Sequence, residues 1–214
     1  MADFRIKAIF LAVFFLLISL VMTGCQKDDL RDAVSAFKKD DAIIVNDDLT
    51  IIKTLVDTFD ESYYLTDELL KMITDEASDF NREHGTGSLT AEKVETEDDL
   101  VNVTLRFSDR EAYAAYNDAI FFVGTIEEAL DHGLKLEQIL YDLNDEGKSI
   151  DRTGLLDIKD DFIIITNDHK SRQVLTVETF GKVLYVSRGI EKWYGQGSVR
   201  IADVGLDLVY VVFK

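Results

Sequence analysis

Cys25, the one cysteine of this chain, is the side chain best suited to covalent chemistry. It lies in the stretch LVMTGCQKDD, where an apolar run gives way to a charge-dense segment. A thiol can serve as a nucleophile, as a redox group or as the acceptor of a covalent modification. A lone cysteine also has no partner for a disulfide within its own chain. The residues around Cys25 decide among these uses.

The residues before Cys25 have the composition of a secretory signal peptide. Arg5 and Lys7 give a positive start, with Asp3 as one opposing charge, and a 14-residue run with a single polar member extends over residues 8–21. A charged start, a short apolar run and small residues before a cut are typical of such peptides. The alternative is an uncleaved membrane anchor over the 17 uncharged residues 8–24, although a spanning helix needs about 20 apolar residues.

Met22, Thr23, Gly24 and Cys25 resemble a bacterial lipobox, with Met22 in the place of the usual leucine. The resemblance implies that the Cys25 thiol receives a diacylglycerol and that the signal peptidase for lipoproteins cuts before it. Two acyl chains attach a protein stably to a bilayer, at about 0.8 kcal/mol per buried CH₂. The alternative is a stray cysteine after an ordinary signal peptide. We expect a protein anchored by lipid to the extracytoplasmic face of a cell membrane, inner or outer.

The chain is expected to have three parts: a lipoprotein signal peptide over 1–24, a lipid-attached tether over 25–41 and a single acidic domain over 42–214. Without Arg5, Lys7 and Asp3, the mature chain has 21 basic and 40 acidic side chains, a net charge of −19. This acidity argues against binding to nucleic acid or flat against an anionic membrane. Membrane contact is therefore expected through the acylated Cys25 alone, and any further partner is a protein or a glycan.

Residues 142–149, DLNDEGKS, partly match a calcium-binding loop. Asp142, Asn144 and Gly147 occupy loop positions 1, 3 and 6, whereas Glu146 stands where a shorter side chain is preferred. The twelfth position, which should supply a bidentate carboxylate, is Thr153. We therefore predict a polar turn without a metal, with Asp142, Asn144 and Glu146 as the ligands if a metal did bind.

Other catalytic signatures are missing from the sequence. No histidine has a metal-binding partner at HExxH spacing, no Gly-x-Ser-x-Gly elbow occurs, and a phosphate-binding loop ending in Gly147-Lys148-Ser149 would need glycine at Asp142. We expect no cofactor. Adjacent acids such as Asp98 and Asp99 could serve a glycosidase only if a cleft held two carboxylates at a fixed distance. A carboxylate-based hydrolase that acts on the cell wall or on a glycan is therefore the alternative function.

Trp193 and Tyr194, beside two glycines in KWYGQG, are candidates for a recognition surface at a hairpin tip. Packing at the edge of the core is the alternative use of these rings. The leading hypothesis is a non-enzymatic binding or envelope-assembly protein whose ligand the sequence does not name.

Several segments indicate secondary structure. β-Branched residues favour a two-stranded hairpin over residues 42–59. Apolar spacing predicts a helix over 66–84 that Thr66 caps, and strict alternation predicts a strand over 101–107. Two capping boxes, Ser108 with Glu111 and Thr125 with Glu128, predict short helices.

The last third of the chain is strand-rich. Strands are expected over 139–143 and 162–166, a hairpin turning near Gly181 over 173–187, and an apolar strand at 208–213. The complete order predicts an α+β domain: a mostly antiparallel sheet with one longer helix and two or more short helices packed on it.

Four segments resemble uncharacterised surface lipoproteins of Gram-positive gut bacteria. They are LTDEL at 65–69, SDREAYAAYN at 108–117, FFVGTIEEAL at 121–130 and GKVLYVS at 181–187. The resemblance covers about half of the chain. It implies the same location and fold, and no established activity comes with it.

Overall fold

The strands of this protein form two mostly antiparallel sheets with helices packed against them, which confirms the predicted α+β class. The computed structural model describes residues 40–58, 65–145, 147–168, 174–187, 190–193, 197–202 and 208–214, with the backbone alone for 190–193 and 202. Within these ranges no helix combines the length and the hydropathy needed to cross a bilayer.

The first sheet has seven strands. Their order is β11 (Ile190–Trp193), β12 (Ser198–Ala202), β9 (Val174–Thr179), β1 (Ala42–Val45), β2 (Ile51–Thr58), β4 (Leu100–Phe107) and β3 (Leu89–Glu97). β1 and β2 form the predicted hairpin, with Ala42 opposite Thr54. β1 pairs in parallel with β9, and the other neighbours in this sheet pair antiparallel.

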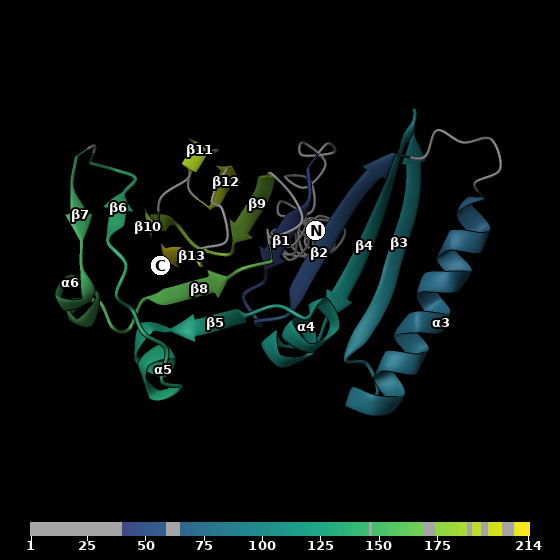
Figure 1. Ribbon diagram of the computed structural model, residues 1–214, viewed down its shortest axis with the longest axis horizontal. Coiled ribbons are helices and arrows are strands. Elements are labelled where there is room, and N and C mark those ends of the chain that lie inside the picture. The colour runs from purple at the N-terminus through teal and green to yellow at the C-terminus, as the bar shows by residue number, and fades with distance from the viewer. Residues whose placement is uncertain are drawn as a thin grey trace, which may run out of the picture. The chain divides into compact units, whose positions relative to one another are not determined.

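The second sheet has six strands. Their order is β5 (Phe121–Thr125), β8 (Phe162–Thr166), β13 (Val209–Phe213), β10 (Val183–Val186), β6 (Leu140–Asp142) and β7 (Ser149–Ile150). The described helices are α3 (Thr66–His84), α4 (Arg110–Asn117), α5 (Ile126–Asp131) and α6 (Arg152–Asp157). Figure 1 shows α3 alongside β3, at the edge of the seven-stranded sheet, and α5 and α6 beside the six-stranded sheet.

The main hydrophobic core lies between the two sheets. Strand β4 contributes the predicted alternating residues Val101, Val103, Leu105 and Phe107, all of them buried. The inward residues of β8, β13 and α3 join the same cluster. A second cluster lies on the other face of the six-stranded sheet, where α5 and α6 cover it.

The seven-stranded sheet therefore has a core face and an outer face. The strand register assigns these side chains to the outer face: Ala42, Ile44, Ile52, Thr54, Val56, Asn102, Thr104, Arg106, Thr176, Glu178, Ser198 and Arg200. Neither hydrophobic cluster of the described residues includes any of them. The two described faces of this sheet thus differ in chemistry.

Two predicted helix caps are wrong. Asp109, and not Ser108, caps α4, because the Asp109 carboxylate accepts the Ala112 N–H at 2.8 Å. The Ser108 N–H is already bonded to the carbonyl of Ser88, which continues the ladder between β3 and β4. Thr66 is the first helical residue of α3 and not its cap. The capping box of Thr125 and Glu128 is confirmed at α5.

The predicted hairpin around Gly181 is also wrong, because β9 and β10 belong to different sheets. After Gly181 the chain pairs with its own C-terminal residue: the Lys182 N–H donates to the Lys214 carbonyl at 2.8 Å and the Lys214 N–H donates to the Lys182 carbonyl at 2.9 Å. A Cβ added at Gly181 would lie 2.4 Å from that Lys214 oxygen. Glycine at this position therefore permits the crossing between the sheets.

Candidate functional site

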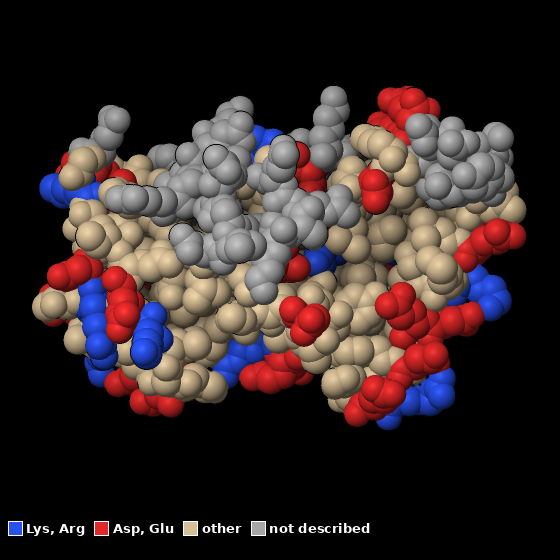
Figure 2. All heavy atoms as spheres, in the orientation of Figure 1, with Lys and Arg blue, Asp and Glu red and all other residues tan. Residues whose placement is uncertain are grey.

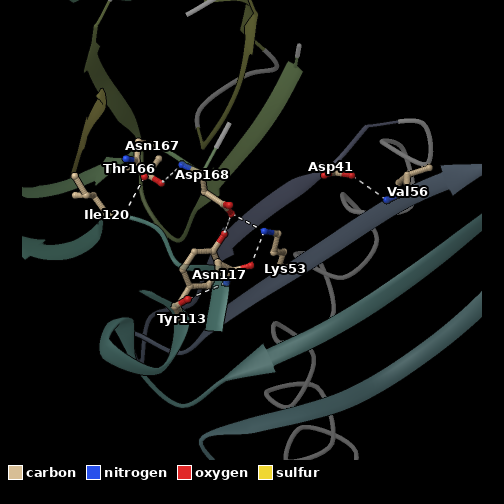
Figure 3. Close-up of polar contacts among 9 residues, drawn as sticks. All are labelled: Asp41, Lys53, Val56, Tyr113, Asn117, Ile120, Thr166, Asn167 and Asp168. Atoms are coloured by element: carbon tan, nitrogen blue, oxygen red, sulfur yellow. Dashed lines mark hydrogen bonds and ion pairs between the residues drawn. The ribbon is translucent and has the colours of Figure 1, made fainter. Parts of the chain in front are cut away.

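Lys53 is a charged side chain on the core face of β2, and it has two oxygen partners. Its Nζ lies 2.6 Å from Asp168 Oδ2 and 2.7 Å from Asn117 Oδ1. Only 9% of the Lys53 side chain and 11% of the Asp168 side chain are exposed. Figure 3 shows these side chains pointing toward one another from β2, from α4 and from the end of β8.

The same cluster holds Tyr113 of α4. Its hydroxyl donates a hydrogen bond to Asp168 Oδ2. Burial raises the pKa of Tyr113 well above its usual value, and the negative charge of Asp168 raises it further, so the phenol stays protonated. Asn117 is held in place because its Nδ2 donates to the Tyr113 carbonyl at 2.8 Å.

The contacts of this cluster fit a structural junction better than a nucleophile or a general base. A lysine attacks a carbonyl only as a free amine, and here the ammonium is bound by a carboxylate and an amide oxygen. A phenol that stays protonated cannot act as a base. The cluster joins β2 of the seven-stranded sheet, α4 and the end of β8 in the six-stranded sheet, so it holds these three elements together.

The outer face presents a different arrangement. Among the described residues, five buried polar side-chain atoms have no hydrogen-bond partner, and all five lie on this face. They are Thr54 Oγ1, Arg106 Nε, Thr176 Oγ1, Glu178 Oε1 and Ser198 Oγ. A buried polar group without a partner costs about 1–3 kcal/mol, and native proteins hold few of them. Their concentration on one face marks it as the candidate functional site.

The strand register brings these groups side by side. Thr54 and Thr176 flank Ala42 in one row across β2, β1 and β9. In the next row Glu178 lies directly opposite Ser198 on β12. Side chains that face each other across antiparallel strands have Cβ atoms about 5 Å apart. The carboxyl group of Glu178 therefore lies among hydroxyl groups.

Glu178 is 2% exposed, and burial raises its pKa to about 7. A carboxyl with such a pKa can gain or lose a proton near neutral pH, which suits a proton donor or acceptor. It also has no cationic partner among the described residues. A ligand that donates hydrogen bonds, or that carries a positive charge, would satisfy it.

Ion pairs flank the unpartnered groups on both sides. The guanidinium of Arg200 binds Asp40 through two bonds, Nε to Oδ2 at 2.8 Å and Nη2 to Oδ1 at 3.3 Å. On β4, Arg106 pairs with Glu92 of β3. Asp40, at the end of the expected tether, is thus already in contact with the sheet.

The groups singled out in the sequence do not meet on this face. Met22, Thr23, Gly24, Cys25, Glu146 and Tyr194 lie outside the described residues, as does the side chain of Trp193. The backbone of Trp193 ends β11, opposite Val199 of the antiparallel strand β12. The carboxylate of Asp142 accepts the backbone N–H groups of Asn144 at 2.7 Å and of Asp145 at 3.2 Å. That pattern is a polar turn, and the described residues contain no cluster of three metal-binding side chains.

Sequence reasoning missed Lys53 and Glu178, although each leaves a trace. Lys53 interrupts an alternating apolar series between Ile51 and Leu55. Glu178 follows the strand residue Val177 in the stretch LTVET. A charged residue inside a β-branched run is a signal that could have marked both.

Comparison with known proteins leaves the chemistry to be argued from these residues. No protein-family model matches the chain, and no curated protein and no solved structure matches it.

Proposed function

We propose that this chain is a lipoprotein, anchored through Cys25 to the extracytoplasmic face of a membrane, that binds a partner and catalyses no reaction. One observation carries the anchoring: Met22, Thr23, Gly24 and Cys25 follow a 14-residue apolar run. The acyl chains would hold the domain at the membrane, and the acidic surface would keep it soluble there.

The outer face supports the binding role. Its unpartnered hydroxyls and the Glu178 carboxyl are buried and spread over β2, β9 and β12, which suits several hydrogen bonds to a bound partner better than reaction at one atom. The partly exposed Ile52 supplies apolar area beside them. Apolar area with a few placed polar groups is the usual composition of a binding site.

Metabolic labelling with an alkyne-tagged fatty acid tests the anchor. The wild type should carry the label and sediment with membranes. Cys25→Ala should lose the label and accumulate as unprocessed precursor, while Cys25→Ser separates the loss of sulfur from a change in size. Label on the Cys25→Ala variant would disprove the anchor.

A photo-crosslinking residue at Ile52 tests the binding face in the full chain. An adduct of defined mass should form, and it should disappear when Glu178→Ala is added. A crosslinker at Glu83, an exposed residue of α3, should not give this adduct. An adduct that forms equally at Glu83, or that persists with Glu178→Ala, would contradict the proposal.

One observation favours the alternative, a carboxylate-based hydrolase of the wall or of a glycan. The pKa of Glu178, raised to about 7, suits a general acid. Such an enzyme needs a second carboxylate, and Asp40, an acid in contact with this face, is bound by Arg200. Release of soluble sugar from purified cell wall by the wild type, with loss in Glu178→Gln, would support the hydrolase. No release by the wild type would support binding.

A further inference from the structure

We propose that the groove between α3 and β3 binds an extended, basic segment of another protein, which adds as a strand to the free edge of β3. The groove has a volume of about 680 Å³. From α3 it is lined by Thr74, Ala77, Ser78 and Asn81, and from β3 by Leu89 and Ala91. Figure 1 shows the two elements running side by side at the edge of the molecule's seven-stranded sheet.

The outward backbone groups of β3 have no described strand beside them, because β3 is the last strand in the order. At Leu89 a side chain takes the place of that strand. Asn81 Oδ1 accepts the Leu89 N–H at 2.8 Å, and Asn81 Nδ2 donates to the Leu89 carbonyl at 2.8 Å. A neighbouring strand makes this same pair of bonds. The edge therefore already accepts strand-like pairing at one end.

The alternation of an antiparallel ladder gives the positions still open. The backbone N–H and C=O groups of Leu89 point away from β4, and those of Ala91, two residues later, point the same way. The register shifts between Ala91 and Lys93. After this shift, the two-residue turn at Asp98 and Asp99 determines which backbone groups bond to β4. By this alternation the backbone N–H and C=O groups of Val94 and Thr96 point outward, away from β4. An added strand would pair with Ala91, Val94 and Thr96.

The charge of the two elements indicates the partner. α3 carries six carboxylates against two basic side chains, and β3 carries three against one. Figure 2 shows acidic side chains over α3 and at the tip of the β3–β4 hairpin. Salt bridges to Lys71, Arg82, Lys93 and Arg106 offset part of this charge. A basic segment would be drawn to this edge.

A second copy of this chain fits the edge poorly. Pairing β3 with itself would bring together two strands that each carry three glutamates against one lysine, and two copies of the acidic α3 with them, so the net charges of the two copies would repel each other. The register shift and the charged side chains of β3 are also devices that protect an edge against self-association. The occupant is therefore a different protein.

The two sides of the groove predict the pattern of the segment. On the outer-face side, β3 presents Glu95 and Glu97 against the single Lys93, which favours lysine or arginine in the added strand. On the α3 side, Thr74 and Ser78 are small, and the half-exposed Leu70 lies one turn before Thr74. Small or β-branched residues fit there. The segment should alternate basic residues with threonine or valine.

Fluorescence anisotropy with a labelled seven-residue peptide of alternating lysine and threonine or valine tests the proposal on the full chain in detergent. The wild type should bind it, and added salt should weaken binding. The variant Thr74→Lys, which fills the groove and repels lysine, should bind at least about tenfold more weakly. Met72→Lys adds the same charge on the opposite side of α3, where the side chain is 59% exposed, and should change the affinity less than twofold.

Hydrogen exchange supplies the second measurement. The peptide should slow exchange at the amides of Ala91, Val94 and Thr96, and thermal unfolding should show that both lysine variants fold. The proposal is overturned if a peptide with glutamate in place of lysine binds equally well. It is also overturned if the wild type fails to bind, if Thr74→Lys binds as the wild type does, or if the chain forms a dimer that Thr74→Lys dissociates. None of these outcomes depends on Cys25, so they leave the anchor as a separate question.

Discussion

Lys53 Nζ and Asp168 Oδ2 lie 2.6 Å apart although 115 positions separate them in the sequence. Lys53 belongs to the seven-stranded sheet and Asp168 follows the last residue of β8 in the six-stranded sheet. Both side chains are almost fully buried. Breaking a buried pair by removing one partner leaves an uncompensated charge, which costs about 3–5 kcal/mol.

We therefore expect Lys53→Met to lower the free energy of unfolding by about 3 kcal/mol, because among the described residues the Asp168 carboxylate would keep only the Tyr113 hydroxyl as a partner. Asp168→Asn should cost less, and the double variant should be more stable than the sum of the single losses predicts. Chemical denaturation of the four proteins measures this coupling. Lys71→Met, which breaks an exposed pair with Asp75, should cost less than about 1 kcal/mol. Equal losses at Lys53 and Lys71 would contradict the role of the cluster.

Gly124 has a local packing role that can be tested. A Cβ at this position would lie 2.5 Å from Glu128 Oε2 and 3.0 Å from Arg110 Nη1. Glu128 Oε2 accepts the Thr125 N–H that begins α5. Gly124→Ala should disturb this cap and lower the free energy of unfolding by about 1–2 kcal/mol. When Glu128→Ala has already removed the cap, the penalty of Gly124→Ala should shrink, and a penalty that stays the same would exclude this cause.

Helices and strands whose signal lies in their own short stretch of sequence were predicted well. The spacing of Leu69, Ile73, Ala77 and Phe80 determines α3, and the alternation of β4 needs only its own sequence to be recognised. The box of Thr125 and Glu128 is likewise local.

The failures concern partners far away in the sequence. Neighbouring strands usually pair, and β9 and β10 do not, because Lys182 pairs with Lys214 at the end of the chain. Ser108 and Asp109 are both good caps, but the Ser108 N–H, which the predicted box needs for Glu111, is bonded to the distant Ser88 carbonyl, and Asp109 caps the helix. The candidate face was missed for the same reason: Thr54, Thr176, Glu178 and Ser198 come from three strands, β2, β9 and β12, that only the folded sheet brings together.

The loop at Asp142 should fold without calcium. The Asp142 carboxylate already accepts two backbone N–H groups of its own turn, and Thr153 replaces the bidentate acid of a calcium loop. The melting temperature should therefore be the same with calcium, at up to about 1 mM, as with a chelator. Asp142→Asn keeps an acceptor for the turn and should melt close to the wild type, whereas Asp142→Ala should melt lower. A melting temperature that rises with calcium and returns with chelator would show that a metal site exists.

Glu178 should make stability depend on pH in a direction opposite to that of most acids. Burial raises its pKa from 4.5 to about 7, so between these values the folded protein binds more protons than the unfolded chain. Its contribution to stability is then complete below pH 4.5, falls as pH rises, and is lost above pH 7. Each pKa unit corresponds to 1.36 kcal/mol, so the shift of Glu178 can lower the free energy of unfolding by about 3 kcal/mol at most.

Glu178→Gln removes the charge and keeps the shape, so it isolates this contribution from the other titrating groups. Denaturation at a series of pH values should show the variant close to the wild type at pH 4.5 and more stable than the wild type by about 2–3 kcal/mol at pH 8. Glu83→Gln, at an exposed position of α3, should follow the wild type throughout. If a cationic partner occupies the outer face, its addition should stabilise the wild type above pH 7 and leave Glu178→Gln unchanged, because only a carboxylate gains from that charge. Curves for the wild type and Glu178→Gln that stay parallel across this range would mean that Glu178 is not buried as a lone carboxyl.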